Sequence, residues 1–317
     1  MSHTPRLSVG LPVYNGEKYL HESLDALLGQ SFDDFELVVS DNASTDGTEE
    51  LCRSYAARDS RIRYIRQARN IGAAPNHNVV FLESRGELFK WASCDDLYGY
   101  DLLGRCVQEL DDHPEAVLSH AFYGIVNDRD PFARVMPYPL ATDARRAPDR
   151  FRSLLYDVGG EDGYGIIRSN ILRRTPLHGS FHPIAERPLL AGLSLYGPFR
   201  QVPECLAFRR HHSNRVGAVS TKREQCAIRD PRRANRLRHP AARMHAEYVW
   251  AYFAGVHRAP LTLAEKRECT RILLGYLGSR VGPATFRAAA SSPPEIAADS
   301  PIVELGSVVA GHHRARS

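Results

Sequence analysis

The chain has 317 residues, of which 43% are hydrophobic and 25% charged, and its formal net charge is +4. These values are ordinary for a globular protein with a sizeable core, and they exclude collagen-like, disulfide-scaffold and wholly disordered chains. No run approaches the roughly 20 apolar residues of a membrane-spanning helix, and the first ten residues hold no apolar signal core, so we expect a cytoplasmic protein. The six cysteines form no CxxC pair and are expected to be free thiols.

Positive charge is concentrated in residues 209–243, which contain eleven Arg or Lys residues against only Glu224 and Asp230. A solvated face is the commoner explanation of such a run, and an acidic partner is the alternative. Because the segment has no interleaved aromatic residues and no recognisable module, we do not expect a nucleic-acid partner.

The first hundred residues alternate strand-like and helix-like segments, which is typical of a parallel sheet with crossover helices. Leu7–Val13 is predicted to be a buried strand, followed by a turn at 14–16 and a helix over 17–29 with its leucines on one face. The segments predicted next are a strand at 35–40, a helix at 49–58, a strand at 62–67, a helix with Pro75 in its first turn that ends near 84, and a strand at 88–92.

Beyond residue 97 the pattern is less regular. We predict a helix at 101–110, a strand at 116–123, a loop at 127–149, helical spacing at 151–174 and 185–195, a short apolar run at 205–209, helices at 241–256 and 263–277, and a poorly ordered tail from about 283. The predicted fold class is therefore α/β, with a core domain at 1–217 and a mainly helical C-terminal extension at 218–317.

A polar loop at 41–48 follows the second predicted strand and reads Asp-Asn-Ala-Ser-Thr-Asp-Gly-Thr. Loops beyond the carboxyl ends of parallel strands converge on one cleft, so we expect Asp41 and Asn42 to lie there. Their carboxylate and amide groups suit the recognition of a nucleobase and a ribose. The alternative is a turn held together by the hydrogen bonds of its own side chains.

The acidic pair Asp95-Asp96 follows the strand at 88–92. Two adjacent carboxylates repel each other unless a cation or hydrogen bonds compensate them. Mg²⁺ and Mn²⁺ take carboxylate oxygens and bridge them to phosphates, so the pair suits a nucleoside-diphosphate site. The alternative is a helix start, where acidic side chains meet the helix dipole favourably.

In their order along roughly residues 6–215, these motifs resemble the family 2 glycosyltransferases of the GT-A fold. The matching positions are Pro12, Tyr14 and Asn15 of a Pro-x-Tyr-Asn turn, Asp41 and Asn42 of the polar loop, Asn70 and Gly72 of an Asn-x-Gly motif, Asn76, and Ser93 and Asp95 of a box that reads Ser-Cys-Asp-Asp where the family has Asp-x-Asp-Asp. The resemblance implies that these residues bind a nucleoside-diphosphate sugar, with a UDP-sugar favoured. It implies a Rossmann-like GT-A core with a nucleotide-sugar-binding half at 1–97 and an acceptor half at 98–217.

The resemblance also implies an inverting, metal-dependent transfer. Asp95 and His212 would hold Mn²⁺ or Mg²⁺ on the donor diphosphate, and Glu186 would be the general base that deprotonates the acceptor hydroxyl. Alternatively, Glu186 pairs with Arg187 or caps its helix, and His212 is a solvated member of the His211-His212 pair. Ser93 in place of the usual Asp leaves the ribose contact open.

Other interpretations stay open at this point. The chain could be a catalytically impaired nucleotide-sugar-binding module, whereas a nucleotidyltransferase is disfavoured because the first strand lacks a glycine-rich phosphate loop. The acceptor is expected to be a saccharide, a lipid-linked molecule or a natural product, in a pocket shaped by segments 127–138 and 163–168. The aromatic C-terminal helices are expected to pack in the core or, alternatively, to contact a membrane surface or a second copy of the chain.

Overall fold

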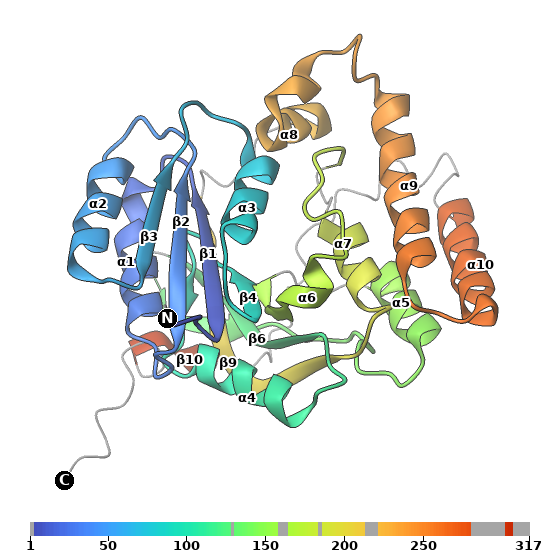
Figure 1. Cartoon of the computed structure of the whole chain (residues 1–317), viewed down its shortest axis with the longest axis horizontal. Helices are drawn as coiled ribbons and strands as arrows, with labels where there is room; N and C mark the ends of the chain where they lie inside the picture. Colours follow the sequence, from blue (N-terminus) through green and yellow to red (C-terminus); the bar gives the residue numbers. More distant parts are fainter. Residues whose placement is uncertain are drawn as a thin grey trace.

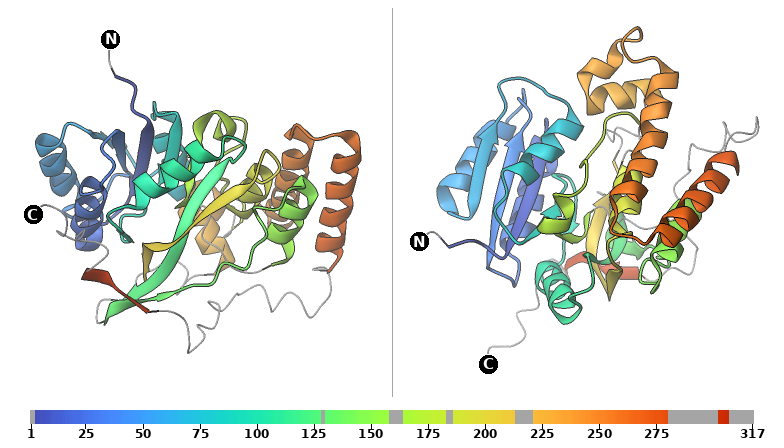
Figure 2. Two further views of the ribbon diagram at one scale, coloured as in Figure 1. Left: turned by 90° about the horizontal axis from the view of Figure 1, so that it is seen from below. Right: turned by 45° about the vertical axis from the view of Figure 1, so that its right-hand side comes forward.

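The computed structural model of the chain describes residues 3–127, 130–157, 164–182, 186–212, 221–279 and 302–306. It shows a mixed sheet with helices on both faces and a group of C-terminal helices at one end (Figure 1). Two further views agree that the N-terminal strands and helices lie at the opposite end of the molecule from the last helices, α9 and α10 (Figure 2). In the ranges given above, no helix is both long enough and apolar enough to cross a membrane.

The described strands form one sheet in the order β10-β7-β6-β8-β4-β1-β2-β3, with β9 paired to β6 and to β5. The strands are β1 Leu7–Val13, β2 Phe35–Asp41, β3 Ile62–Arg66, β4 Leu88–Trp91, β5 Leu97–Tyr98, β6 Leu118–Asn127, β7 Asp130–Val135, β8 Ile166–Arg168, β9 Phe199–Arg210 and β10 Ile302–Glu304. The helices are α1 Glu17–Leu28, α2 Thr48–Arg58, α3 Ala73–Leu82, α4 Leu102–Asp112, α5 Ala147–Tyr156, α6 Ser169–Leu172, α7 Glu186–Leu193, α8 Lys222–Arg229, the 3-10 helix η3 Pro231–Ala234, α9 Ala241–Arg258 and α10 Leu263–Ser279.

The N-terminal half confirms the predicted alternation of strands and crossover helices. Strands β3, β2, β1 and β4 are parallel, so that Val13 pairs with Asp41 and Gly10 pairs with Trp91. Their apolar side chains are buried on both faces, one against α1, α2 and α4 and the other against α3, as expected for a parallel sheet covered by helices. This register brings the carboxyl ends of β1, β2 and β4 to the same edge of the sheet.

Several predictions for the second half are wrong. The stretch predicted to be helical at 151–174 contains α5, the strand β8 and the short α6, and the loop predicted at 127–149 contains β7 and the start of α5. The short run at 205–209 is part of the twelve-residue strand β9. Strand β8 forms because Ile166 and Ile167 fill the space between β4 and β6 and pair with both, which periodicity alone cannot indicate.

The C-terminal helices share a hydrophobic cluster with the second half of the sheet domain. Tyr248 and Tyr252 of α9 are buried among residues of α5, α7 and α10, which favours core packing for this aromatic face. Helix α9 comes close to α7 where Gly192 faces Gly255. Trp250 lies on the other side of α9 and is 70% exposed. The predicted tail from 283 lies outside the described residues except for 302–306, where β10 pairs with β7.

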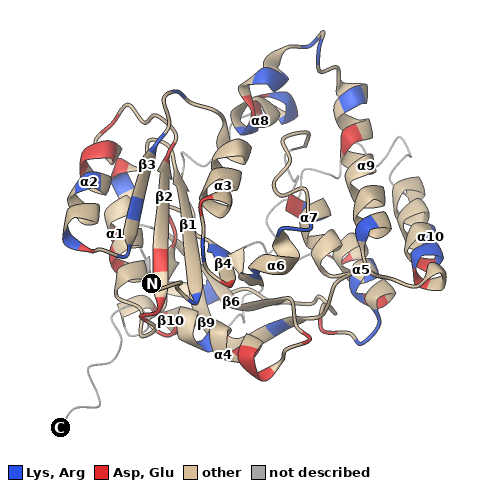
Figure 3. Ribbon diagram, in the orientation of Figure 1, with Lys and Arg blue, Asp and Glu red and all other residues tan. Residues whose placement is uncertain are grey.

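The described residues of the basic segment form the end of β9, then α8, η3 and the start of α9 (Figure 3). Part of its charge is neutralised within the protein, because Arg232 pairs with Asp230 at 2.9 Å and both Arg233 and Arg243 pair with Glu247. These contacts favour a structural role for the arginines that form them.

Candidate active site

The turn after β1 and the polar loop after β2 are interlocked at the carboxyl edge of the sheet. The backbone N–H of Thr45 donates to Asn15 Oδ1 at 2.8 Å, and the backbone N–H of Asn15 donates to Ser44 Oγ at 2.9 Å. Asn15 has φ of 51°, a conformation that asparagine tolerates better than most residues. Pro12 is buried within β1, whereas the ring of Tyr14 is 48% exposed. Of these predicted ligand contacts, Tyr14 and Asn15 are both exposed.

Asp41, predicted to read the nucleotide, is fully buried at the end of β2. Its carboxylate accepts the backbone N–H of Ser44 at 2.8 Å and the Tyr64 hydroxyl at 2.9 Å, and it forms an ion pair with Arg66. Burial by itself raises the pKa of Asp41, but these hydrogen bonds outweigh burial, so the pKa lies below its ordinary value. The contacts fix the polar loop in place, and a contact of Asp41 with a nucleotide stays a prediction.

The asparagines of the predicted site also hydrogen-bond within the protein. Asn42 Oδ1 accepts the Ile71 N–H at 2.8 Å, and its amide donates to Asn70 Oδ1 at 3.0 Å. Asn70 Oδ1 also accepts the Gly72 N–H at 2.9 Å. These bonds tie the loop before α3 to the end of β2.

Asn76, in the first turns of α3, likewise bonds to β2. Its amide donates to the Ser40 carbonyl oxygen at 2.8 Å, and its Oδ1 accepts the Ser40 hydroxyl at 2.7 Å. The side chain is 2% exposed. The bonds therefore anchor α3 on the sheet, and a ligand contact for Asn76 stays a prediction.

Gly72 shows why a glycine is needed before α3. Its φ of 96° is rarely adopted by other residues, and an added Cβ would lie 2.5 Å from the carbonyl oxygen of Arg229 and 2.8 Å from Asp230 Cα. The end of α8 thus packs directly against the loop that precedes α3. Residues of the C-terminal extension thereby contact the N-terminal half.

Asp95 and His212 lie in direct contact although they are 117 residues apart in the sequence. His212 Nε2 is 2.9 Å from Asp95 Oδ2, and the Ser93 hydroxyl donates to Asp95 Oδ1. The two side chains are 18% and 13% exposed. The structure therefore brings together three of the predicted site residues at the carboxyl end of β4.

The contact is built by the pairing of β5 with β9 and by Arg210, the arginine of the Arg-His-His segment that ends at His212, to which the motifs assigned no role. The backbone N–H of Arg210 donates to Asp96 Oδ1 at 3.0 Å, and its guanidinium donates to the Asp95 carbonyl oxygen at 3.1 Å. The guanidinium also pairs with Glu22 at 2.7 Å and covers the Tyr19 ring at 4.6 Å. The residues before His212 are thus locked to the acidic loop.

The donor set at this position fits a divalent cation of the Mg²⁺ or Mn²⁺ type. Asp95 offers carboxylate oxygen, His212 offers imidazole nitrogen and Ser93 offers a hydroxyl group. Within the part of the chain that the structure describes, no three His, Cys, Asp or Glu side chains group as a metal site by themselves. An ion held here would need further ligands from a substrate, as is usual for Mg²⁺ bound beside phosphates.

Glu186, the predicted base, is the first residue of α7 and pairs with Arg229 of α8 rather than with Arg187. The Arg229 guanidinium lies 2.9 Å from Glu186 Oε2. Glu186 Oε1 makes no hydrogen bond with any described residue, and the side chain forms no ion pair with His212. The structure thus holds the Glu186 carboxylate beside Arg229, and its role as base stays a prediction.

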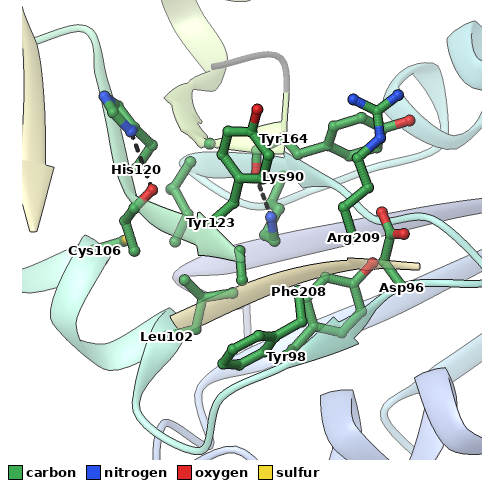
Figure 4. A pocket seen from close by; sticks show the side chains of 14 residues that line it. Lys90, Asp96, Tyr98, Leu102, Cys106, His120, Tyr123, Tyr164, Phe208 and Arg209 are labelled. Carbon is green, nitrogen blue, oxygen red and sulfur yellow. Dashed lines mark hydrogen bonds between the residues drawn. The ribbon is translucent and has the colours of Figure 1, made fainter. Parts of the chain in front are cut away.

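A pocket opens beside Asp96, between β4, β6, β9 and α4 (Figure 4). Residues 164–166, within a segment expected to shape the acceptor site, line this pocket, whereas no described residue of 127–138 does. The sequence analysis also missed Lys90, whose side chain reaches the pocket from the middle of β4. A lysine between the apolar Phe89 and Trp91 in a predicted buried strand is the sequence feature that could have indicated this residue.

The parallel four-strand unit, the interlocked loops at its carboxyl edge and the Asp95–His212 pair define an α/β fold with a candidate ligand site at the carboxyl edge of the sheet. Residues 8–179, more than half of the chain, match the family model described as glycosyl transferase family 2. The chain therefore belongs to glycosyl transferase family 2, and the predicted family and glycosyltransferase class are confirmed.

Curated relatives agree with the family assignment. The chain is 28% identical over 159 residues to the uncharacterized glycosyltransferase EpsJ of Bacillus subtilis, covering 48% of this chain and 46% of that protein. It is 28% identical over 117 residues to the glycosyltransferase GlyG of Streptococcus pneumoniae, covering 37% and 39%. The matches span less than half the length of these relatives.

Solved structures confirm the GT-A-type fold. TarS of S. aureus, residues 1–349, in complex with UDP-GlcNAc, superposes with a TM-score of 0.63 at 19% identity, covering 87% of this chain and 72% of that one. The mannosyltransferase PcManGT of Pyrobaculum calidifontis, in complex with GDP-Man and Mn²⁺, gives a TM-score of 0.51 at 17% identity, covering 90% and 83%.

Proposed function

We propose that the protein transfers a sugar from a nucleoside-diphosphate sugar to an acceptor hydroxyl, with inversion at the anomeric carbon and with Mn²⁺ or Mg²⁺ as cofactor. The observation that carries the proposal is the contact of Asp95 with His212 at the carboxyl edge of a parallel sheet. A ligand set of one carboxylate and one imidazole is incomplete without substrate oxygens, which a diphosphate provides. A UDP-sugar is favoured because the structure of TarS, whose fold is similar, is a complex with UDP-GlcNAc.

In this proposal the chain's own residues bind and orient the reactants. Tyr14 is open to the nucleotide, and Asp95, His212 and Ser93 face the diphosphate. A bound divalent cation would neutralise charge on the departing nucleoside diphosphate. Glu186 Oε1 accepts the proton of the acceptor hydroxyl while that oxygen bonds to the anomeric carbon from the face opposite the leaving group. Only one carboxylate is needed near the reacting carbon, unlike in most glycoside hydrolases.

Donor recognition is tested by thermal unfolding with nucleotides and their sugars, with and without Mn²⁺. A ligand that binds the folded state at one hundred times its Kd stabilises it by about 2.7 kcal/mol. We expect the largest shift with UDP or a UDP-sugar in the presence of Mn²⁺. A larger shift with GDP would mean that the donor carries guanine instead of uracil. A shift that is the same with and without Mn²⁺ would contradict the proposal that the metal takes part in donor binding.

Catalysis is tested by the release of nucleoside diphosphate and by sugar transfer to an acceptor panel. We expect Asp95→Asn to lower turnover roughly 10²-fold, the usual cost of losing one electrostatic group at the reacting centre. His212→Gln should lower turnover at least tenfold, whereas His211→Gln, one residue away, is the matched control and should be close to wild type. Nucleotide binding without turnover on any donor would instead support the binding-only module.

A further inference from the structure

Lys90 occupies a position in β4 that an apolar side chain would ordinarily fill. It lies between Phe89 and Trp91 and is 2% exposed. Its Nζ donates to the Tyr164 carbonyl oxygen and lies 5.5 Å from the centre of the Tyr98 ring. It forms no ion pair with any carboxylate that the structure describes. A buried ammonium without a carboxylate partner is costly to maintain, so another source of negative charge is expected near it.

The Lys90 amine lies at the pocket beside Asp96, which we call the Lys90 pocket. Its polar and aromatic lining residues include Lys90, Asp96, Tyr98, Tyr123, Tyr164 and Arg209. Figure 4 shows the amine near the middle of this group, with Arg209 and Asp96 together on one side. Tyrosine rings make up much of the wall and offer faces against which a sugar ring can stack.

The charges that line the Lys90 pocket do not balance. Lys90 and Arg209 are cationic, and Asp96 is the one carboxylate among the lining residues. Asp96 also accepts the backbone N–H of Arg210 at 3.0 Å, so part of its hydrogen-bonding capacity is already used. Burial lowers the pKa of Lys90 to about 8, with the nearby Cys106 and Asp96 opposing this effect, so the amine is still mostly protonated at neutral pH. The pocket is therefore suited to an anionic group.

We propose that the Lys90 pocket is the acceptor site and that the acceptor is a saccharide bearing an anionic group, a carboxylate or a phosphate, which pairs with the Lys90 amine. The inference rests on the proposed glycosyl transfer, because Asp96 adjoins the candidate metal ligand Asp95 and so places the pocket beside the donor diphosphate. The tyrosine rings cover the sugar while Lys90 and Arg209 meet its charge. A neutral sugar would leave Asp96 as the one carboxylate to balance two cations among the lining residues.

The test compares the binding of glucose, glucuronate and glucose 6-phosphate to the full chain with UDP and Mn²⁺ present, by saturation-transfer NMR and calorimetry. We expect at least one anionic sugar to bind tenfold or more tightly than glucose, and the two anionic ligands distinguish a carboxylate from a phosphate site. Lys90→Met should abolish that preference. Lys266→Met is the matched control, since the Lys266 amine on α10 donates to the His257 carbonyl oxygen and does not line the Lys90 pocket, and it should retain the preference.

Arg209→Gln provides a second variant that leaves β4 untouched, and it should reduce the preference for the anionic sugar. Equal binding of all three sugars, or a preference that survives Lys90→Met in a folded protein, would overturn the inference. UDP binding and donor turnover are measured on the same samples. Turnover without an anionic preference would end only this inference. A Lys90-dependent anionic preference in a chain that binds no nucleotide would end the proposed function and with it the acceptor role, and would leave only an anion site.

Discussion

Replacing Lys90 by methionine is expected to stabilise the fold at neutral pH. The pKa of Lys90 is lowered from its ordinary value of 10.5 to about 8, chiefly by burial. Two and a half pH units at about 1.4 kcal/mol each give about 3–4 kcal/mol by which the folded state disfavours the ammonium. Methionine is unbranched and of similar length, so it can fill the same space without a charge. The expected gain in the free energy of unfolding is therefore at most about 3–4 kcal/mol.

The stability difference between the wild type and Lys90→Met should depend on pH. Between pH 8 and 10.5 the amine of the unfolded chain keeps its proton while that of the folded chain loses it. The unfolded state then binds more protons, so the wild type gains stability from this group as the pH rises. The methionine variant has no such group. Its advantage over the wild type should be full below pH 8 and should shrink towards zero near pH 10.5.

The measurement is urea unfolding of the wild type, Lys90→Met and Lys266→Met from about pH 7 to about pH 10, followed by tryptophan fluorescence. Trp91 is a suitable probe because it is 1% exposed and adjoins Lys90 in β4. Subtracting the variant from the wild type removes the titration of other groups that the two proteins share. A difference that stays constant over this pH range would refute the claim that the Lys90 ammonium is desolvated.

Three further predictions concern the same edge of the sheet. Arg229→Gln removes the ion pair of Glu186 and should lower kcat about tenfold with the donor KM unchanged in steady-state kinetics, and an unchanged kcat would argue against a positioning role. Gly72→Ala should destabilise the protein by about 1–3 kcal/mol in calorimetry, because φ is 96° and the new Cβ would meet the Arg229 carbonyl; an unchanged Tm would contradict this. Asp41→Asn should cost about 2 kcal/mol at neutral pH, since hydrogen bonds to a buried charged group are lost. The pKa of Asp41 lies below its ordinary value of 3.8, so the stabilisation by the Asp41 carboxylate is full above pH 3.8 and disappears as the pH falls through the folded-state pKa. A loss of stability in Asp41→Asn that is equal at neutral and strongly acidic pH would contradict this prediction.

The first four strands and their helices could be predicted because each is specified by neighbouring residues. Leu20, Leu24 and Leu27 recur at helical spacing and are buried as predicted, and Leu7–Val13 is a continuous buried strand. The second half resisted prediction for the opposite reason. The three residues of β8 carry too little periodicity to identify a strand, and they become one by pairing with β4 and β6, which lie far away in the sequence.

The candidate site was likewise predictable only in part. The motifs located the loop at Asp41 and the acidic pair, but they could not show that Asp41 is fully buried against Arg66 or that Glu186 pairs with Arg229. They assigned no role to Arg210, whose backbone and guanidinium hold the acidic loop against the end of β9. These partners are set by strand pairing and helix docking.

By itself, the sequence determined the order of strands, turns and helices in the N-terminal half and the polar loops that follow the strands, because propensity, periodicity and turn chemistry act over a few residues. Tertiary structure alone decided that Asp95 meets His212 across 117 residues and that Lys90 is buried at a pocket. Such contacts depend on which strands pair and which faces become covered, and no local pattern records that choice.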